Sequence, residues 1–431
     1  MSNVVLPSHK ITMDGTFTEN SLKKLQIILQ SLSSAGRHVN GDESVETRGK
    51  VFTGPFCLLL GSSLLMITGI GMFYMFPLFV LELGGNRADI GLLMGLTSLA
   101  AVAGRPLVSN MVDRIGRKKS MISSCLVMAV VSLLHLVIGD TIESVYPILV
   151  ILRLFFGVAF ALGIVASLTM AADLVAGPRL NEGLGIFGIM PMLGLALGPL
   201  LGELIITHFG FQAMFLGASA IFVICIFSLS PLRDIFQDSG TLSKGGFFRV
   251  LAFPLVWRMA LASLSFGAAF AAHAGFVAPY AHTHDVPASA YFGFYSAAAI
   301  LSRLFIGRLT HLFGEMLLIP AAMVIAGIGF ISLIAVSNTL GFIMAGFVAG
   351  LGHGLFFPSL MALSIRHMVA SNRGKVAGIL TGGFDSGIFL GSLLMGQLGD
   401  ILGFNAVFGL AAAATFIGFV SFHAMKPKIE E

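Results

Sequence analysis

Long apolar stretches recur along the chain, and they constrain its fold more than any other feature. A hydrocarbon layer about 30 Å thick is crossed by a helix of about 20 apolar residues. By that measure the sequence predicts twelve membrane-spanning helices, at 54–81, 89–111, 120–138, 147–173, 183–207, 211–231, 256–280, 289–308, 315–336, 340–365, 374–398 and 404–425. The sequence therefore predicts an all-α integral membrane protein with two pseudo-symmetric six-helix halves.

The composition excludes a water-soluble fold. Hydrophobic residues make up 56% of the 431 positions and charged residues only 11%, whereas a soluble domain has about a quarter charged residues. The three cysteines, Cys57, Cys125 and Cys225, lie far apart inside apolar stretches. They fit neither a disulfide framework nor a structural zinc site.

Composition also divides the chain into five parts. These are a partly disordered cytoplasmic tail, a six-helix bundle, a charged cytoplasmic loop, a second six-helix bundle and a short cytoplasmic tail, at 1–51, 52–231, 232–255, 256–425 and 426–431. The first apolar run begins near Phe52, too late for a signal peptide. Residues 21–34 place leucine and isoleucine on one helical face, which is suited to a membrane surface. A locally helical tail without a role in transport is the alternative.

The basic residues predict the orientation. Every Lys and Arg lies in the tails or near the connections on one side, except for Arg87, Arg105, Arg153 and Arg303. Because Lys and Arg accumulate on the cytoplasmic side, both termini are expected in the cytoplasm. We expect the protein to lie in the bacterial cytoplasmic (inner) membrane.

The two halves carry traces of an internal repeat. Residues 105–116 in span two align with residues 303–314 in span eight. Spans five and eleven correspond at a constant offset through the glycines Gly194, Gly198, Gly387 and Gly391. Repeated halves are typical of transporters whose halves move about a shared site near the membrane midplane.

The charged loop after span two carries a specific resemblance. Residues 113–119, Asp-Arg-Ile-Gly-Arg-Lys-Lys, resemble the Gly-x-x-x-Asp-Arg-x-Gly-Arg-Lys loop of the major facilitator superfamily, with Ser109 in place of its first Gly. Residues 153–157, Arg-Leu-Phe-Phe-Gly, are similar to the family's Arg-x-x-Gln-Gly motif, with Phe156 replacing Gln.

Span five extends the resemblance to a subgroup. Residues 194–202 resemble the Gly-x-x-x-Gly-Pro-x-x-Gly motif of export antiporters, and Glu203 stands where a second Gly often follows. Residues 172–174, 181–185 and 384–387 resemble a bacterial efflux-type subgroup. The resemblance covers about residues 52–425.

Two groups of residues are expected to govern the change of conformation. The first is a cytoplasmic gate whose charges would bond across the two halves, formed by Asp113, Arg114, Gly116, Arg117, Arg105 and Arg303. For the loop residues, an orientation signal attracted to anionic lipid is the alternative; for Arg105 and Arg303, it is snorkelling of the side chain to the membrane surface. His311 replaces the Asp in the second copy, so the two gates should be unequal. The second is a hinge or packing face in span five, formed by Gly194, Gly198, Pro199 and Gly202.

Four residues are candidates for proton coupling or the substrate cavity: Asp385, Arg153, His353 and Thr381. Asp385 lies near the middle of span eleven and shares a face with Thr381. Arg153 lies inside span four, where a charge costs at least a few kcal/mol without a polar surrounding, so we expect a polar cavity or a partner. A structural ion pair is the alternative for both charges; a helix–helix hydrogen bond is a further alternative for Asp385, and a side chain that snorkels to the outer interface is one for Arg153. His353 has a hydrogen-bonded packing role as its alternative.

The sequence thus predicts a secondary active transporter that works by alternating access. Proton-coupled export of a small organic molecule is the first hypothesis, because the spans that would line a cavity are largely apolar. Uptake of a metabolite or sugar is the second, and a non-transporting membrane scaffold or sensor is the third. Enzyme motifs are missing from the sequence, and we expect no cofactor and no metal. The expected partners are substrate, protons and lipid, without nucleic acid; the chain is expected to be monomeric, with a tail that contacts the membrane or another protein.

Overall fold

The computed structural model of the chain describes residues 51–423, apart from 140, 176–178, 235–249 and 369. The predicted helix at 21–34 and the C-terminal tail at 426–431 lie outside the described residues. The described residues form helices joined by short connections, without a strand among them. This confirms the predicted all-α class.

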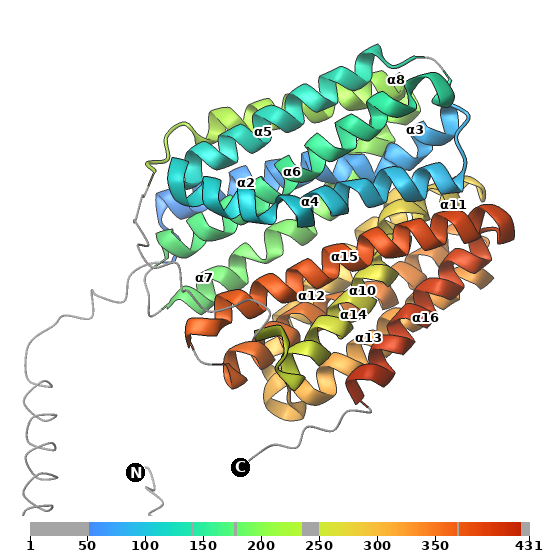
Figure 1. Ribbon diagram of the computed structural model, residues 1–431. Helices are drawn as coiled ribbons and strands as arrows, with labels where there is room; N and C mark the ends of the chain where they lie inside the picture. The colour runs from blue at the N-terminus through green and yellow to red at the C-terminus, as the bar shows by residue number, and fades with distance from the viewer. Residues whose placement is uncertain (1–50, 140, 176–178, 235–249, 369, 424–431) are drawn as a thin grey trace, which may run out of the picture. The chain divides into compact units, whose positions relative to one another are not determined.

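The helices of the first bundle follow one another in chain order: α2 (Gly54–Met72), η2 (Phe73–Met75), α3 (Phe76–Glu82), α4 (Arg87–Ile115), α5 (Arg117–Leu134), η3 (His135–Val137), α6 (Ile142–Leu174), α7 (Leu180–Phe187) and α8 (Ile189–Leu229). The second bundle has α10 (Pro254–Gly275), α11 (Val277–His282), α12 (Ala288–Phe313), α13 (Glu315–Ser332), η5 (Leu333–Ala335), α14 (Thr339–His367), α15 (Ala370–Leu402) and α16 (Phe404–His423). Figure 1 shows these two sets as separate groups, blue to green and yellow to red.

Twelve membrane crossings result from these helices. Eleven continuous helical stretches of the described residues are long and apolar enough to span a membrane, and one of them, Glu182–Leu229, has 48 residues. Gly210 interrupts that stretch with φ 80° and ψ 177°, a conformation open to glycine but rarely to other residues. It therefore divides the stretch into two crossings, and the predicted count of twelve is confirmed.

Several spans are not the continuous helices that hydropathy predicts. Span one contains the 3₁₀ turn η2 just before Pro77, which has no backbone N–H to donate. Span seven breaks at Phe276, between α10 and α11. The second bundle begins at Pro254 rather than at 256, because proline is favoured in the first turn of a helix.

Glycine faces hold the helices of each bundle together in the same way. A Cβ on Gly198 of α8 would lie 2.5 Å from backbone atoms of Gly71 in α2. In the second bundle, a Cβ on Gly391 of α15 would lie 2.4 Å from the carbonyl oxygen of Ala268 in α10. Because Gly198 and Gly391 correspond in the internal repeat, the repeat is also a repeat of packing.

The two ends of the bundles carry different glycines. Gly84, Gly210 and Gly403, with positive φ, lie in connections at one end, and Gly116 and Gly314 lie at the other. We refer to these as the Gly84 end and the Gly116 end. The predicted orientation assigns the Gly116 end to the cytoplasm.

Candidate functional site

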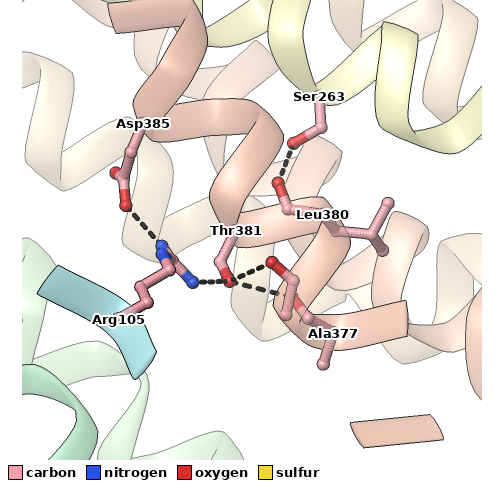
Figure 2. Close-up of polar contacts among 7 residues, drawn as sticks. Arg105, Ser263, Ala377, Leu380, Thr381 and Asp385 are labelled. Carbon is pink, nitrogen blue, oxygen red and sulfur yellow. Dashed lines mark hydrogen bonds and ion pairs between the residues drawn. The ribbon is translucent and has the colours of Figure 1, made fainter. Parts of the chain in front are cut away.

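An arginine of the first bundle joins the second bundle near the middle of the spans. The Nη2 atom of Arg105 in α4 donates to the carboxylate of Asp385 in α15, and Nη1 donates to the hydroxyl of Thr381 at 2.6 Å. Figure 2 shows the guanidinium of Arg105 turned toward both side chains. The side chains of Arg105 and Asp385 are only 29% and 15% exposed. The structure thus brings together one predicted gate residue and two predicted coupling residues.

A second arginine makes the corresponding contact from the other bundle. Arg303 in α12 donates through Nη1 to the carbonyl oxygen of Gly188, at the break between α7 and α8. In the internal repeat, Gly194 corresponds to Gly387, 193 residues further along the chain. By the same offset, Gly188 corresponds to Thr381, and Met192 corresponds to Asp385. The two contacts are therefore related by the internal repeat, but only one of them contains a carboxylate.

The Gly84 end is held by carboxylates at helix N-termini. Glu203 near the end of the first crossing in α8 accepts hydrogen bonds from the backbone N–H groups of Ala288 and Ser289, both at 2.8 Å. Asp400 of α15 accepts one from the N–H of Arg87 at 3.3 Å. A negative charge is favourable at a helix N-terminus. Each contact joins one bundle to the other, and the sequence identified Glu203 only as a departure from a family motif.

Close packing of α4 on α15 accompanies these contacts. A Cβ on Gly91 would lie 2.3 Å from the carbonyl oxygen of Ser392, and one on Gly396 would lie 2.8 Å from the Cα of Gly91. Toward the Gly116 end of α15, a Cβ on Gly374, Gly378 or Gly382 would meet no atom within 4 Å. The bundles are therefore in tight contact at the Gly84 end, whereas the face of α15 that carries these three glycines meets open space.

The charged loop at the Gly116 end contacts its own bundle. The Nε atom of Arg117 lies 3.1 Å from a carboxylate oxygen of Asp173 at the end of α6. Lys118 donates its backbone N–H to Asp234 at 3.2 Å and its ammonium to the carbonyl oxygen of Ser230 at 2.8 Å. These bonds lie within the first bundle, whereas the predicted bonds would join the two halves. Asp113 and Arg114, the other two charges of this loop that were assigned to the gate, are exposed.

The second bundle contains a counterpart of this loop with its charges reversed. Gly314 has φ 72° and is followed by buried Glu315, which pairs with Arg366 at 2.9 Å. The alignment showed His311 in place of the motif's Asp and therefore a weakened copy. The second bundle nevertheless retains the positive φ of the glycine and an ion pair directly after it. A comparison of the two repeats that allowed for reversed charges would have identified Glu315.

Arg153 lies among aromatic rings of the first bundle rather than beside a carboxylate. Its guanidinium carbon lies 3.3 Å from the ring centroid of Phe76 and 5.0 Å from that of Phe73. The whole residue is 2% exposed, and Nε and Nη2 have no hydrogen-bond partner within the described part of the chain. A cation over an aromatic face is stabilised by the ring quadrupole. An aromatic pocket thus takes the place of the expected polar cavity or partner, and Phe156, which replaces the motif's Gln, belongs to it with its ring centroid 5.6 Å from the guanidinium carbon.

His353 belongs to a buried cluster of histidine and tyrosine side chains. Its Nδ1 lies 2.6 Å from the hydroxyl of Tyr295, whose ring centroid lies 4.0 Å from that of His273. Tyr291 of α12 and Tyr74 of the first bundle each lie 5.6 Å from His273, centroid to centroid. Both ring nitrogens of His273 and the hydroxyl of Tyr291 have no hydrogen-bond partner among the described residues. We refer to these five residues as the aromatic cluster.

Comparisons with known proteins agree with this architecture. Repeated six-helix bundles are typical of membrane transporters whose halves move about a shared site. The family model described as Major Facilitator Superfamily matches residues 58–344 and 288–430. The chain belongs to the Major Facilitator Superfamily and is an integral membrane transport protein rather than an enzyme.

Individual relatives are distant. The chain is 26% identical over 388 residues to the multidrug resistance protein MdtG of Klebsiella pneumoniae, which covers 86% of this chain and 90% of that protein. It is 24% identical over 380 residues to an uncharacterized MFS-type transporter of Methanocaldococcus jannaschii, covering 82% and 94%. The crystal structure of a mutant of the nucleoside transporter NupG superposes with a TM-score of 0.74 at 15% identity, covering 87% of this chain and 100% of that chain. The last likeness shows the fold alone.

Proposed function

We propose that this protein is a proton-coupled exporter of a small organic molecule in the bacterial inner membrane, and that Asp385 carries the coupling proton. One observation carries the proposal. Of the ion pairs between described residues, only Arg105–Asp385 joins the two bundles; the others lie within a bundle. Because this ion pair can be broken by protonation of Asp385, it is suited to link proton binding to movement of one bundle relative to the other.

The proposed coupling is a competition between a proton and a guanidinium. The anionic carboxylate of Asp385 holds Arg105, and α4 stays attached to α15. Binding of a proton removes the negative charge, so the strong charge-assisted bond to Arg105 is lost. The bundles are then free to separate, and the return of Arg105 favours release of the proton.

The contacts at the two ends support one step of alternating access. The Glu203 and Asp400 contacts close the bundles at the Gly84 end, while Gly374, Gly378 and Gly382 are uncovered toward the Gly116 end. With the Gly116 end in the cytoplasm, this is a conformation open to the inside. In the opposite conformation, Glu203 and Asp400 must leave the helix N-termini. These bonds would therefore break and form again in each transport cycle.

Export is favoured over uptake by the aromatic and apolar character of the inner helices. Buried rings of Phe266, Phe270, Phe292 and Phe356 surround the aromatic cluster. Such surroundings suit lipophilic or amphipathic molecules better than sugars. The name of the MdtG relatives, a multidrug resistance protein, also supports export.

The proposal is tested with purified protein in proteoliposomes that are given a panel of organic molecules with and without a proton gradient. Asp385→Asn should abolish gradient-driven transport while retaining substrate exchange. Glu143→Gln, which removes an exposed carboxylate from the first turn of α6, is the matched control and should behave like the wild type. Undiminished gradient-driven transport by Asp385→Asn would reject the coupling role. Transport by neither protein, across the panel, would favour the scaffold or sensor.

A further inference from the structure

The internal repeat places Arg105 and Arg303 in equivalent positions but gives them unequal partners. Arg105 is bound by a carboxylate and a hydroxyl, from Asp385 and Thr381. Arg303 is bound by the carbonyl oxygen of Gly188, and Met192 replaces the carboxylate. The positive charge is thus neutralised in one copy of the arrangement and left without a counter-charge in the other.

The guanidinium of Arg303 has donors to spare. It carries five N–H donors, and the structure shows Nη1 bound to Gly188 while the buried Nε has no partner among the described residues. No carboxylate of the described residues forms an ion pair with it. A charge within a membrane span costs at least a few kcal/mol when it is not compensated. A binding partner of negative charge would remove that cost.

The helix that carries Arg303 also carries two tyrosines of the aromatic cluster. Tyr295 and Tyr291 precede Arg303 on α12 by eight and twelve residues, which is about 12 Å and 18 Å along the helix axis. Among the described residues, the ring nitrogens of His273 and the hydroxyl of Tyr291 have no hydrogen-bond partner, although both residues are about 1% exposed or less. Flat aromatic faces and unused polar atoms thus lie roughly two to three helical turns from an uncompensated cation.

The aromatic cluster also lies where the bundles meet. Tyr74 of the first bundle contacts His273 and Phe292 of the second, with ring centroids 5.6 Å and 5.5 Å apart. When the bundles separate, these rings must part and uncover the faces now in contact. Because α12 runs from the Gly84 end to the Gly116 end, a molecule that enters from the Gly116 end would meet the guanidinium of Arg303 first and the cluster after it.

We propose that Arg303 binds the anionic group of the transported molecule, and that the aromatic cluster binds an attached aromatic ring. The substrate class is therefore aromatic organic anions. This inference rests on the proposed transport function, since it names the cargo of that same site. In this arrangement the substrate's anion takes the place at Arg303 that Asp385 takes at Arg105.

Purified full-length protein tests the proposal through equilibrium binding of three probes of nearly equal shape: indole-3-acetate, indole-3-acetamide and tryptamine. These are an anion, a neutral amide and a cation. The wild type should bind the anion at least about tenfold more tightly than the amide, the effect of one charge-assisted bond, and should bind tryptamine most weakly. Equal affinity for anion and amide, or no binding of the anion, overturns the proposal.

Two variants separate an anion site from a structural contact. Arg303→Gln should lose the preference for the anion, and Met192→Asp should lose it as well, because a carboxylate then occupies the position equivalent to Asp385 and neutralises the intact arginine. Melting temperatures close to that of the wild type verify that both variants fold. Persistence of the preference in folded Met192→Asp or Arg303→Gln overturns the proposal.

Failure of this inference is distinguishable from failure of the proposed function. The binding assay contains no proton gradient and does not require transport. Selective anion binding without gradient-driven transport would support Arg303 as the site and reject proton coupling. Gradient-driven transport without a preference for the anion would support proton coupling and reject Arg303 as the anion site.

Discussion

Arg117 and Glu315 occupy equivalent positions in the two bundles and carry opposite charges. Each begins a helix directly after a glycine of positive φ, with φ 93° at Gly116 and 72° at Gly314. Each is buried and pairs with a residue near the end of the next helix, Asp173 or Arg366. The repeat thus conserves an ion pair and its location while reversing its polarity.

Reversing the pair in the first bundle should therefore be tolerated, whereas breaking it should not. Arg117→Glu places two carboxylates together and should lower stability by about 3–5 kcal/mol, the usual effect of breaking a buried pair. The double variant Arg117→Glu/Asp173→Arg should recover most of that loss, since the second bundle uses this polarity. Melting of the purified proteins measures both effects. An equally unstable double variant would show that the polarity itself is required.

The contact of α8 with α2 should not tolerate a single methyl group. Gly198→Ala would bring a Cβ to 2.5 Å from the backbone of Gly71, so helices must move apart and the melting temperature should fall by several degrees, corresponding to about 1–3 kcal/mol. Gly61→Ala in α2, where no atom lies within 4 Å, is the control and should have no such effect. Equal effects of the two variants would mean that α2 and α8 are not held by this close approach.

The carboxylate of Glu203 should keep the Gly84 end closed. It lines a cavity of about 350 Å³ together with Thr207 and Asp285. Glu203→Gln removes the charge from the N-terminus of α12 and should increase, several-fold, the rate at which an Ala288→Cys side chain, buried in the closed conformation, reacts with a membrane-impermeant maleimide. Asp285→Asn, in the same cavity, serves as the control and should leave the rate unchanged. A rate unaffected by Glu203→Gln would contradict closure by this carboxylate.

Arg153 should contribute more to transport than to stability. Its charge is buried on the ring of Phe76 without a carboxylate partner among the described residues, so part of the cost of burial is not recovered. Arg153→Met keeps a similar length and should leave the melting temperature equal or higher, while gradient-driven transport falls at least about tenfold. If stability falls and transport is retained, the role of Arg153 is structural.

Much of this arrangement follows from the sequence, because helical spacing is a local property. The apolar stretches predict the spans, and the spacing of Thr381 and Asp385 predicts that they share a face. That Arg105 is their partner could not be predicted, because pairing between bundles depends on how twelve helices are placed in space.

Some corresponding residues of the internal repeat differ in charge, and a comparison of motifs does not detect them. A search for matching residues finds Arg105 and Arg303 but passes over Glu315, since a reversed charge counts as a mismatch. It also passes over Met192, whose importance lies in not being a carboxylate. Glu203 similarly gains its meaning only from the N-terminus of α12, a neighbour that lies far away in the chain.

The proposed coupling requires that protonation of Asp385 releases Arg105. Spin labels at Asn110→Cys in α4 and Gly374→Cys in α15, in a background without other cysteines, report the distance between bundles at the Gly116 end. Lowering the pH from about 8 to about 5, a range in which a carboxylate can titrate, should shift the distance distribution of the wild type toward that of Asp385→Asn. The distribution of Asp385→Asn itself should not change with pH. A wild-type distribution that is independent of pH, or an equal shift in Asp385→Asn, would contradict the account.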